Sequence, residues 1–250
     1  MRFVVKGALL PGLAGEVAEF EEWAATLPAM DKPPGYSMFF DLRGRRECGG
    51  SAAEPPAEPQ PAALPAADAP PALCDAERRN ATIRRVRLSP ADGVAFLTRD
   101  RERYVKGMRE FCGKFMRPPG DALFSCGAGH GACVDAYGAV QACLPLRAPE
   151  TTVSLRERPD GLRYALTEAF PRLRETKATN PEYLRRCAVC FLKGLCEQCP
   201  AKSWAESGTL DAPVEYLCEV AHEQARHLGL LERGESARLV TDRKARVERI

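Results

Sequence analysis

The 250-residue chain has almost no net charge and no long apolar run, and each absence excludes a class of protein. Its 36 basic and 34 acidic residues leave a net charge of +2, so nucleic acid is not expected as its main partner. The apolar run near the amino terminus is broken at Pro11, and no stretch approaches the length of a membrane span. We therefore expect a cytoplasmic protein that binds neither nucleic acid nor membrane.

Histidine is also scarce, with three residues, whereas cysteine is abundant, with eleven. Cysteines of a cytosolic protein bind metal more often than they form disulfides. Three are scattered through the first half, namely Cys48, Cys74 and Cys112. The other eight crowd the second half: Cys126, Cys133, Cys143, Cys187, Cys190, Cys196, Cys199 and Cys218. The distribution predicts metal sites in the second half.

The beginning of the chain alternates strand-like and helix-like segments. Residues 2–10 read as a buried strand, residues 15–27 as an amphipathic helix and residues 36–42 as a second strand. Strand, helix and strand at this spacing predict a βαβ unit with parallel pairing. Two such strands cannot complete a covered sheet. This part therefore either packs against another chain or belongs to something larger.

A different composition follows at about residues 49–75, which are rich in alanine and proline and predict a flexible, disordered insertion. Cys48 and Cys74 flank it, and we expect unpaired thiols there because no second pair is near. Further on, Ser89 followed by proline predicts the start of a helix. Cys112 lies on a later apolar stripe and is expected to be a buried core thiol.

The densest cysteine segment, Cys187–Cys199, reads CAVCFLKGLCEQC. It holds two Cys-x-x-Cys pairs separated by five residues, with no histidine among them. Each pair can turn both thiolates toward one metal centre. A short amphipathic helix over residues 162–170, ended by Pro171, is predicted before this segment. Cys218 follows it in a predicted helix over residues 213–230, near enough in the chain to return as a ligand.

A second cysteine-rich stretch lies upstream. Cys126 precedes a glycine-rich loop, and Cys133 and Cys143 flank a predicted β-hairpin that turns at Asp135–Gly138. Glycines in the loop let the backbone wrap closely around a bulky centre and direct N–H groups at it. His130, in the same loop, is either an additional ligand or, as is commoner for a lone histidine, a surface residue.

Two metal chemistries fit eight clustered cysteines. A zinc ribbon usually places a dozen or more residues between its Cys-x-x-Cys knuckles, and the five residues here are too few. Bacterial ferredoxins have the pattern Cys-x-x-Cys-x-x-Cys-x-x-x-Cys-Pro, and this chain shares only its last two residues, at Cys199-Pro200. Eight cysteines supply four ligands each to two [4Fe–4S] clusters, which is the simplest interpretation. They could equally supply four ligands each to two zinc ions. Composition leaves both open.

The order of the cysteines resembles the SPASM domain, the carboxyl-terminal auxiliary-cluster module of radical S-adenosylmethionine enzymes. The pattern is Cys126, eleven residues, Gly138, four residues, Cys143, a gap, the segment Cys187–Cys199, a gap and Cys218. The resemblance covers about residues 120–230. Two residues separate Cys196 from Cys199, where the family usually has three, and this difference affects local geometry more than the number of ligands.

The resemblance implies interleaved ligands for two [4Fe–4S] clusters. The first group of ligands would be Cys126, Cys133, Cys143 and Cys199. The second group would be Cys187, Cys190, Cys196 and Cys218. Cys133 lies outside the seven-cysteine signature of the family.

The same resemblance implies an α/β organisation in three parts. Residues 1–118 would be the last βα units of a partial (β/α) barrel, interrupted by the insertion at about 49–75. Residues 119–230 would form the SPASM domain, a small cysteine-rich α+β domain with a β-hairpin and helices. Residues 231–250 would be a charged carboxyl-terminal tail, expected as a solvated helix.

The catalytic Cys-x-x-x-Cys-x-x-Cys motif of radical S-adenosylmethionine enzymes is absent from this chain. The expected function is therefore that of the carboxyl-terminal portion of a peptide- or protein-modifying enzyme, with clusters for electron transfer or substrate docking. S-adenosylmethionine would bind only with the missing core segment. Partners would be that core or an electron donor, and a peptide or protein substrate. A stand-alone iron–sulfur redox or scaffold protein and a zinc-binding structural module are the alternatives.

Overall fold

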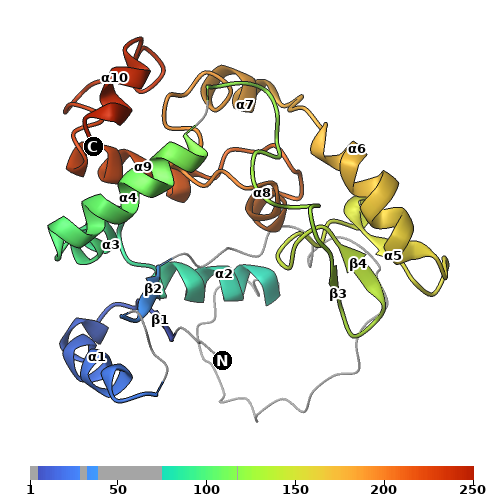
Figure 1. Ribbon diagram of the computed structural model, residues 1–250, viewed down its shortest axis with the longest axis horizontal. Helices are drawn as coiled ribbons and strands as arrows, with labels where there is room; N and C mark the ends of the chain where they lie inside the picture. The colour runs from blue at the N-terminus through green and yellow to red at the C-terminus, as the bar shows by residue number, and fades with distance from the viewer. Residues whose placement is uncertain (1–4, 29–32, 39–74, 117) are drawn as a thin grey trace, which may run out of the picture.

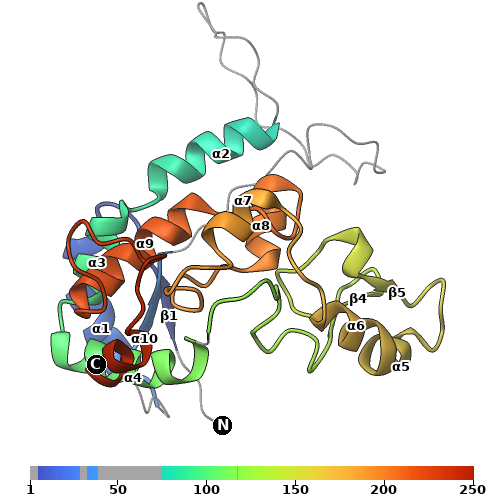
Figure 2. The same ribbon diagram turned by 90° about the horizontal axis from the view of Figure 1, so that it is seen from above.

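The structure is a computed structural model that describes residues 5–28, 33–38, 75–116 and 118–250. It mixes helices with two small sheets, in agreement with an α/β chain at the coarse level. Figures 1 and 2 show the amino-terminal elements at one end of the molecule and the β-hairpin region at the other. The helices that flank the four-cysteine segment Cys187–Cys199 lie between these two ends.

The predicted βαβ unit is confirmed. Strand β1 (Lys6–Ala8), helix α1 (Val17–Ala25) and strand β2 (Gly35–Ser37) follow one another, and the two strands pair in parallel. The rest of the second predicted strand lies outside the described residues, as do the insertion and the flanking Cys48 and Cys74. The described part of this sheet has two strands, and the barrel remnant stays a prediction.

Three helices follow, α2 (Asp75–Val86), α3 (Pro90–Leu97) and α4 (Arg101–Phe115). The predicted cap of α3 is confirmed, because the Ser89 hydroxyl accepts the N–H of Asp92 at 3.1 Å and Pro90 occupies the first helical position. Cys112 on α4 is 1% exposed, which confirms the buried core thiol. Burial raises the pKa of this thiol to about 11.

The predicted hairpin is formed by β3 (Cys133–Val134) and β4 (Ala139–Gln141), and β5 (Val153–Ser154) adds a third antiparallel strand. The Asp135 carboxylate accepts the N–H groups of Tyr137 and Ala139, each at 2.9 Å. Gly138 has φ +83°, a conformation that glycine adopts without steric cost. Asp135 therefore serves the turn.

The helix after the sheet does not end at Pro171 as predicted. It runs through α5 (Gly161–Tyr164), a π-helical turn (Ala165–Ala169) and α6 (Phe170–Arg174). Proline in a regular helix interior would remove one i→i−4 hydrogen bond and clash with the preceding turn. The π turn resets the register, so that the proline lies in the first turn of α6.

The last helices are α7 (Pro181–Arg186), α8 (Pro200–Ser207), α9 (Glu215–His227) and α10 (Arg243–Glu248). Helix α9 confirms the helix predicted over residues 213–230. One core cluster joins the hairpin region to α7 and α8 around Phe170, Tyr183 and Trp204. A second joins α4, the four-cysteine segment, α9 and the tail. The four-cysteine segment thus lies between two cores.

The tail was expected to be solvated, and this expectation is wrong for its apolar residues. Ala237, Val240 and Ile250 are 3%, 2% and 6% exposed and belong to the second core cluster. The N–H of Phe191 donates to the carbonyl of Ala237 at 2.9 Å. The predicted charge is exposed at Arg238, Lys244 and Arg249, whereas the Arg246 side chain is 14% exposed and pairs with Glu235. Among the described residues, no helix has the length and apolarity needed to span a membrane.

Candidate metal centres

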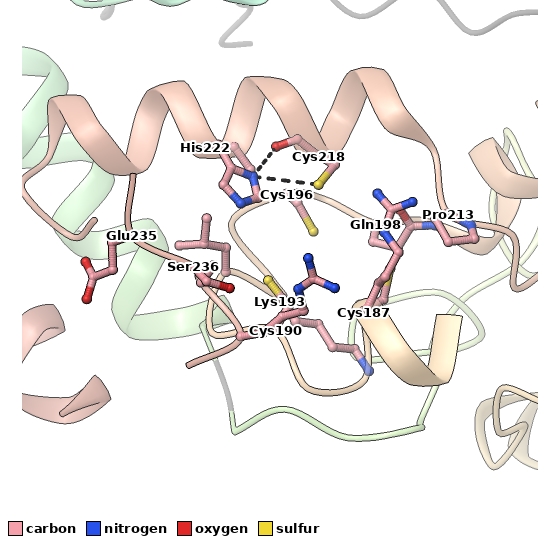
Figure 3. A pocket seen from close by; sticks show the side chains of 15 residues that line it. Cys187, Cys190, Lys193, Cys196, Gln198, Pro213, Cys218, His222, Glu235 and Ser236 are labelled. Carbon is pink, nitrogen blue, oxygen red and sulfur yellow. Dashed lines mark hydrogen bonds between the residues drawn. The ribbon is translucent and has the colours of Figure 1, made fainter. Parts of the chain in front are cut away.

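The second group of predicted ligands surrounds one cavity between α7, α9 and the four-cysteine segment. The cavity has a volume of about 280 Å³, and its lining includes Cys187, Cys190, Cys196 and Cys218. Figure 3 shows the four side chains arranged around this common space, with Cys218 reaching it from α9. Two separate parts of the chain therefore contribute thiols to one site: the four-cysteine segment, with Cys187, Cys190 and Cys196, and helix α9, with Cys218.

An ion pair fixes two of these cysteines relative to each other. Arg186, the last residue of α7, donates to both carboxylate oxygens of Glu215, the first residue of α9, at 2.6 and 2.8 Å. Cys187 follows Arg186 directly, and Cys218 lies one turn after Glu215. Because a bidentate pair constrains orientation as well as distance, it holds both cysteine backbones at the cavity.

The start of α7 is held by a second carboxylate. Asp211 accepts the backbone N–H groups of Thr179 and Asn180, each at 2.8 Å. The Asn180 side chain in turn caps α7 by accepting the N–H of Glu182 at 2.9 Å. Burial alone would raise the pKa of Asp211, but these hydrogen bonds outweigh it and lower the pKa below its ordinary value of 3.8.

We predict that Asp211→Asn lowers the free energy of unfolding by about 1 kcal/mol at neutral pH, because a neutral amide accepts the two N–H groups more weakly. A depressed pKa in the folded state contributes stability above the unfolded pKa, and this contribution is lost as the pH falls through the folded pKa. The difference between Asp211→Asn and the unaltered chain should therefore narrow from neutral pH to about pH 3. Urea denaturation of both proteins at both pH values measures this difference in the free energy of unfolding. The same difference at both pH values would contradict the role of the Asp211 charge.

The thiols of the second group are not equivalent. Burial raises the pKa of Cys187 to about 12 and that of Cys196 to about 11, and neighbouring thiols of the group add to the increase. Burial also raises the pKa of Cys190. The pKa of Cys218 is lowered, chiefly by its hydrogen bond with His222. Each of the four thiols must give up its proton to bind a metal, whose positive charge offsets the cost of burying thiolates.

The first group of predicted ligands lies at the hairpin. Burial raises the pKa of Cys143, and the charges of Cys199, Cys126 and Cys133 act on it in the same direction. Cys143 and Cys199 pack against the same core cluster. Cys126 also adds to the effect of burial on Cys199. Cys126 and Cys199 both line a further cavity of about 280 Å³. The fold therefore brings Cys199 to the hairpin.

The glycine-rich loop after Cys126 is attached to α6. Arg174 donates from one guanidinium nitrogen to the carbonyls of Cys126, at 2.8 Å, and of Ala128. Gly129 has φ +81°, and a Cβ atom there would lie 3.1 Å from Phe170. The loop thus approaches the helix closely, as glycine permits. His130 is exposed, which agrees with its interpretation as a surface residue.

The path of the four-cysteine segment separates its last two cysteines. Glu197 lies between Cys196 and Cys199 with φ +47°, a left-handed conformation that is uncommon for residues other than glycine. Cys196 packs against the core cluster of α4 and α9, and Cys199 packs against the core cluster of the hairpin region. Cys187 packs against the hairpin-region cluster as well, so the cysteines of the segment contact both core clusters.

The two cavities share two lining residues, Lys193 and Gln198. The Gln198 amide donates to the Ser203 hydroxyl at 2.7 Å and to the Ala212 carbonyl at 3.0 Å. Its oxygen accepts the N–H of Val214 at 3.3 Å. One side chain between Cys196 and Cys199 thus ties the segment to α8 and to the approach of α9, so it supports both sites.

We predict that Gln198→Leu destabilises the chain by about 2 kcal/mol, because it leaves the buried Ser203 hydroxyl and two backbone groups without this partner. Metal content should fall at both groups together. Urea denaturation and metal analysis measure the two effects. Glu197→Gln, at the position before Gln198, is the control. The Glu197 side chain is 45% exposed and its ion pair with Lys202 is 3.6 Å long, so its loss should cost little stability. Loss confined to one group would contradict the shared role.

The four cysteines that line the cavity of the second group offer thiols alone, the donors that iron–sulfur clusters commonly take. Among the described ranges, no three cysteine, histidine or carboxylate side chains form a group that could hold a single metal ion. In an iron–sulfur cluster the thiolates bind different irons, so their sulfurs need not converge on one point. The cavity of the second group also has many times the space that one water needs.

Four supporting residues near these groups were not predicted to connect distant segments. Arg174 and Arg186 belong to arginine-rich runs whose commoner interpretation is helix-surface charge, with an electrostatic effect on a cluster at Cys187 as the alternative for Arg186. Neither Gln198 nor Asp211 carries a motif. A fifth residue, His222, follows Cys218 at i+4 within a predicted helix, and this spacing alone places both on one face. That signal could have identified His222 from the sequence.

We found no family model, no curated protein and no solved structure that matches this chain. The resemblance to the SPASM domain therefore rests on the order and spacing of the cysteines.

Proposed function

We propose that the chain binds two [4Fe–4S] clusters as the SPASM-like carboxyl-terminal portion of a radical S-adenosylmethionine peptide- or protein-modifying enzyme. The first cluster would be held by Cys126, Cys133, Cys143 and Cys199. The second would be held by Cys187, Cys190, Cys196 and Cys218. The observation that carries the proposal is the cavity lined by four cysteines from two segments of the chain, Cys187–Cys199 and α9.

Such a cluster supplies one-electron transfer when it is bound, and the residues of this chain would hold and shield it. The Arg186–Glu215 pair keeps α7 and α9 at the distance that presents Cys187 and Cys218. Leu192 and Ala221, 1% exposed each, line the same cavity and reduce access of water. A drier surrounding strengthens the electrostatic effect of nearby charges on a bound centre.

Catalysis of radical formation is assigned to another segment, because the Cys-x-x-x-Cys-x-x-Cys motif is absent from this chain. The chain alone is then expected not to cleave S-adenosylmethionine. Its role would be to pass electrons or to dock a peptide or protein substrate. The parallel strands β1 and β2, with α1 between them, are consistent with the end of a βα repeat.

Anaerobic reconstitution with iron and sulfide tests the proposal. We expect about eight iron and eight sulfide per chain, from two four-iron clusters, together with a brown protein and reversible bleaching by dithionite. A chain with all eight cysteines of the two groups changed to alanine, but with Cys112 retained, is the matched control. Colourless protein that binds only zinc would overturn the proposal and favour a structural zinc module.

The stand-alone alternative is tested separately. If the reconstituted chain carries both clusters, a search for a Cys-x-x-x-Cys-x-x-Cys segment encoded beside it distinguishes a portion of an enzyme from an independent redox protein. Cleavage of S-adenosylmethionine that depends on adding that segment would support the first. Reversible redox chemistry with no such segment would support the second.

A further inference from the structure

His222 lies at the cavity of the second group, one helical turn after Cys218. Both residues are on α9 at i and i+4, so their side chains share one face of the helix. His222 lines the cavity together with the four cysteines. Figure 3 shows its ring beside Cys218, on the side of α9 that faces the cysteines.

The hydrogen bonds of the ring assign its proton. His222 Nδ1 lies 2.7 Å from the carbonyl oxygen of Cys218. A carbonyl oxygen can only accept, so Nδ1 must carry hydrogen and act as the donor. The Sγ atom of Cys218 lies 3.6 Å from the same nitrogen, within reach of the same N–H because sulfur is a large acceptor. The Nδ1–H group is thus shared between the carbonyl and the sulfur.

We propose that His222 is a positioning residue that donates its Nδ1–H to the Cys218 sulfur and thereby raises the reduction potential of the second centre. Reduction adds one electron to a centre whose thiolates are already negative. A donor to a ligating sulfur withdraws electron density and so stabilises the reduced form more than the oxidised form. The inference rests on the proposed function, because it concerns the centre that the second group would hold.

Direct ligation by His222 is the rival role. Nδ1 is engaged as a donor and offers no lone pair, and four thiols already surround the cavity. A ligand role would therefore need the other ring nitrogen to displace one of the cysteines. The positively charged Arg186, Lys193 and Arg238 also line this cavity, and Arg186 acts on Cys218 as well. Substitutions of His222 alone leave these three residues in place, so they separate its effect from theirs.

Two substitutions separate the hydrogen bond from the ring. His222→Phe keeps a planar ring and removes the donor. His222→Asn removes the ring but can keep an N–H donor near the position of Nδ1. His227→Ala, five residues further on α9, is the control for damage to the helix, since His227 packs its ring against Tyr104 at a centroid distance of 5.6 Å.

The full chain is reconstituted with iron and sulfide and titrated with dithionite, and the reduced centres are followed by electron paramagnetic resonance. We expect His222→Phe to keep the iron content of the unaltered chain and to shift one of the two potentials to a more negative value. His222→Asn should restore most of that shift, and His227→Ala should leave both potentials unchanged. A Cys199→Ala background, in which the second centre remains, identifies the shifted potential.

Unchanged potentials in His222→Phe would overturn the inference. Loss of half the iron in His222→Phe, with full iron content in His227→Ala, would also overturn it, because such a loss would indicate that His222 is a ligand. If His222→Phe fails to fold, His222→Asn tests the donor role. A reduction potential equal to that of the unaltered chain supports this role, and loss of iron opposes it. An unaltered chain that binds no iron would refute the proposed function itself, which keeps the two failures distinct.

Discussion

Changing Cys199 to alanine is expected to remove about half of the bound iron, and the lost half should belong to the first group. The reason is the position of Cys199, which packs with Cys143 against the core cluster of the hairpin region and lines a cavity with Cys126. Cys196, three positions earlier, lines the cavity with Cys187 and Cys218. Two cysteines of one Cys-x-x-Cys pair would thus serve different centres.

Pairs of substitutions make this prediction decisive. Adding Cys143→Ala to Cys199→Ala should cause no further loss, because both would disable the same centre. Adding Cys190→Ala should remove the remaining iron. Iron losses should therefore not add for two substitutions within one group, and they should add for substitutions in different groups. This is the behaviour expected of residues that act on two separate sites. Iron and sulfide analysis measures it, and Cys190→Ala alone is the matched control. Complete loss from Cys199→Ala alone, or additive loss with Cys143→Ala, would contradict the interleaved assignment.

The second large effect is expected from Gly194→Ala. Gly194 has φ +104°, and a Cβ atom there would overlap the carbonyl oxygen of Phe115 and lie 2.9 Å from its carbonyl carbon. Both are backbone atoms at the end of α4, which a rotamer change cannot move aside. Overpacking of about 1–3 kcal/mol adds to left-handed strain of about 1–2 kcal/mol. We therefore expect a loss of about 3 kcal/mol or more in the free energy of unfolding, with reduced iron at the second centre.

Gly208→Ala separates strain from overlap. Gly208 also has a positive φ, +75°, but a Cβ atom there would meet nothing within 4 Å. Its cost should be about 1–2 kcal/mol from strain alone, with the iron content unchanged. Urea denaturation and iron analysis of both variants measure the difference. Equal losses in the two proteins would show that the close approach of Gly194 to Phe115 does not matter.

These predictions treat the four-cysteine segment as the connection between two cores. Phe191, Leu192 and Leu195 are each 3% exposed or less and pack with α4, α9 and the tail. Cys187 and Cys199, at the two ends of the segment, pack against the core of the hairpin region. This arrangement gives substitutions such as Gln198→Leu an effect on both groups.

Elements with strong local signals were predicted correctly. The hairpin at Asp135–Gly138 and the helix that Ser89 begins follow from contacts within a few residues, and such contacts are visible in the sequence. The helix that continues through Pro171 was missed, because its π turn breaks the period on which the prediction depends. Burial of the tail was missed because Ala237, Val240 and Ile250 lie outside the helices, and their burial depends on contacts with α4, α9 and the four-cysteine segment.

The sequence by itself determined the donor chemistry of this protein: eight thiols in the second half, four of them in thirteen residues without histidine. It also determined the βαβ unit, the hairpin and the helix that carries Cys218. Only the tertiary structure decided which side chains contact those thiols or hold the helices and loops that carry them, because these contacts join residues far apart in the chain. Arg186 and Glu215 are 29 positions apart, and Arg174 reaches Cys126 across 48. Such pairs have no period in the sequence, and they form only once the two cores have packed on either side of Cys187–Cys199.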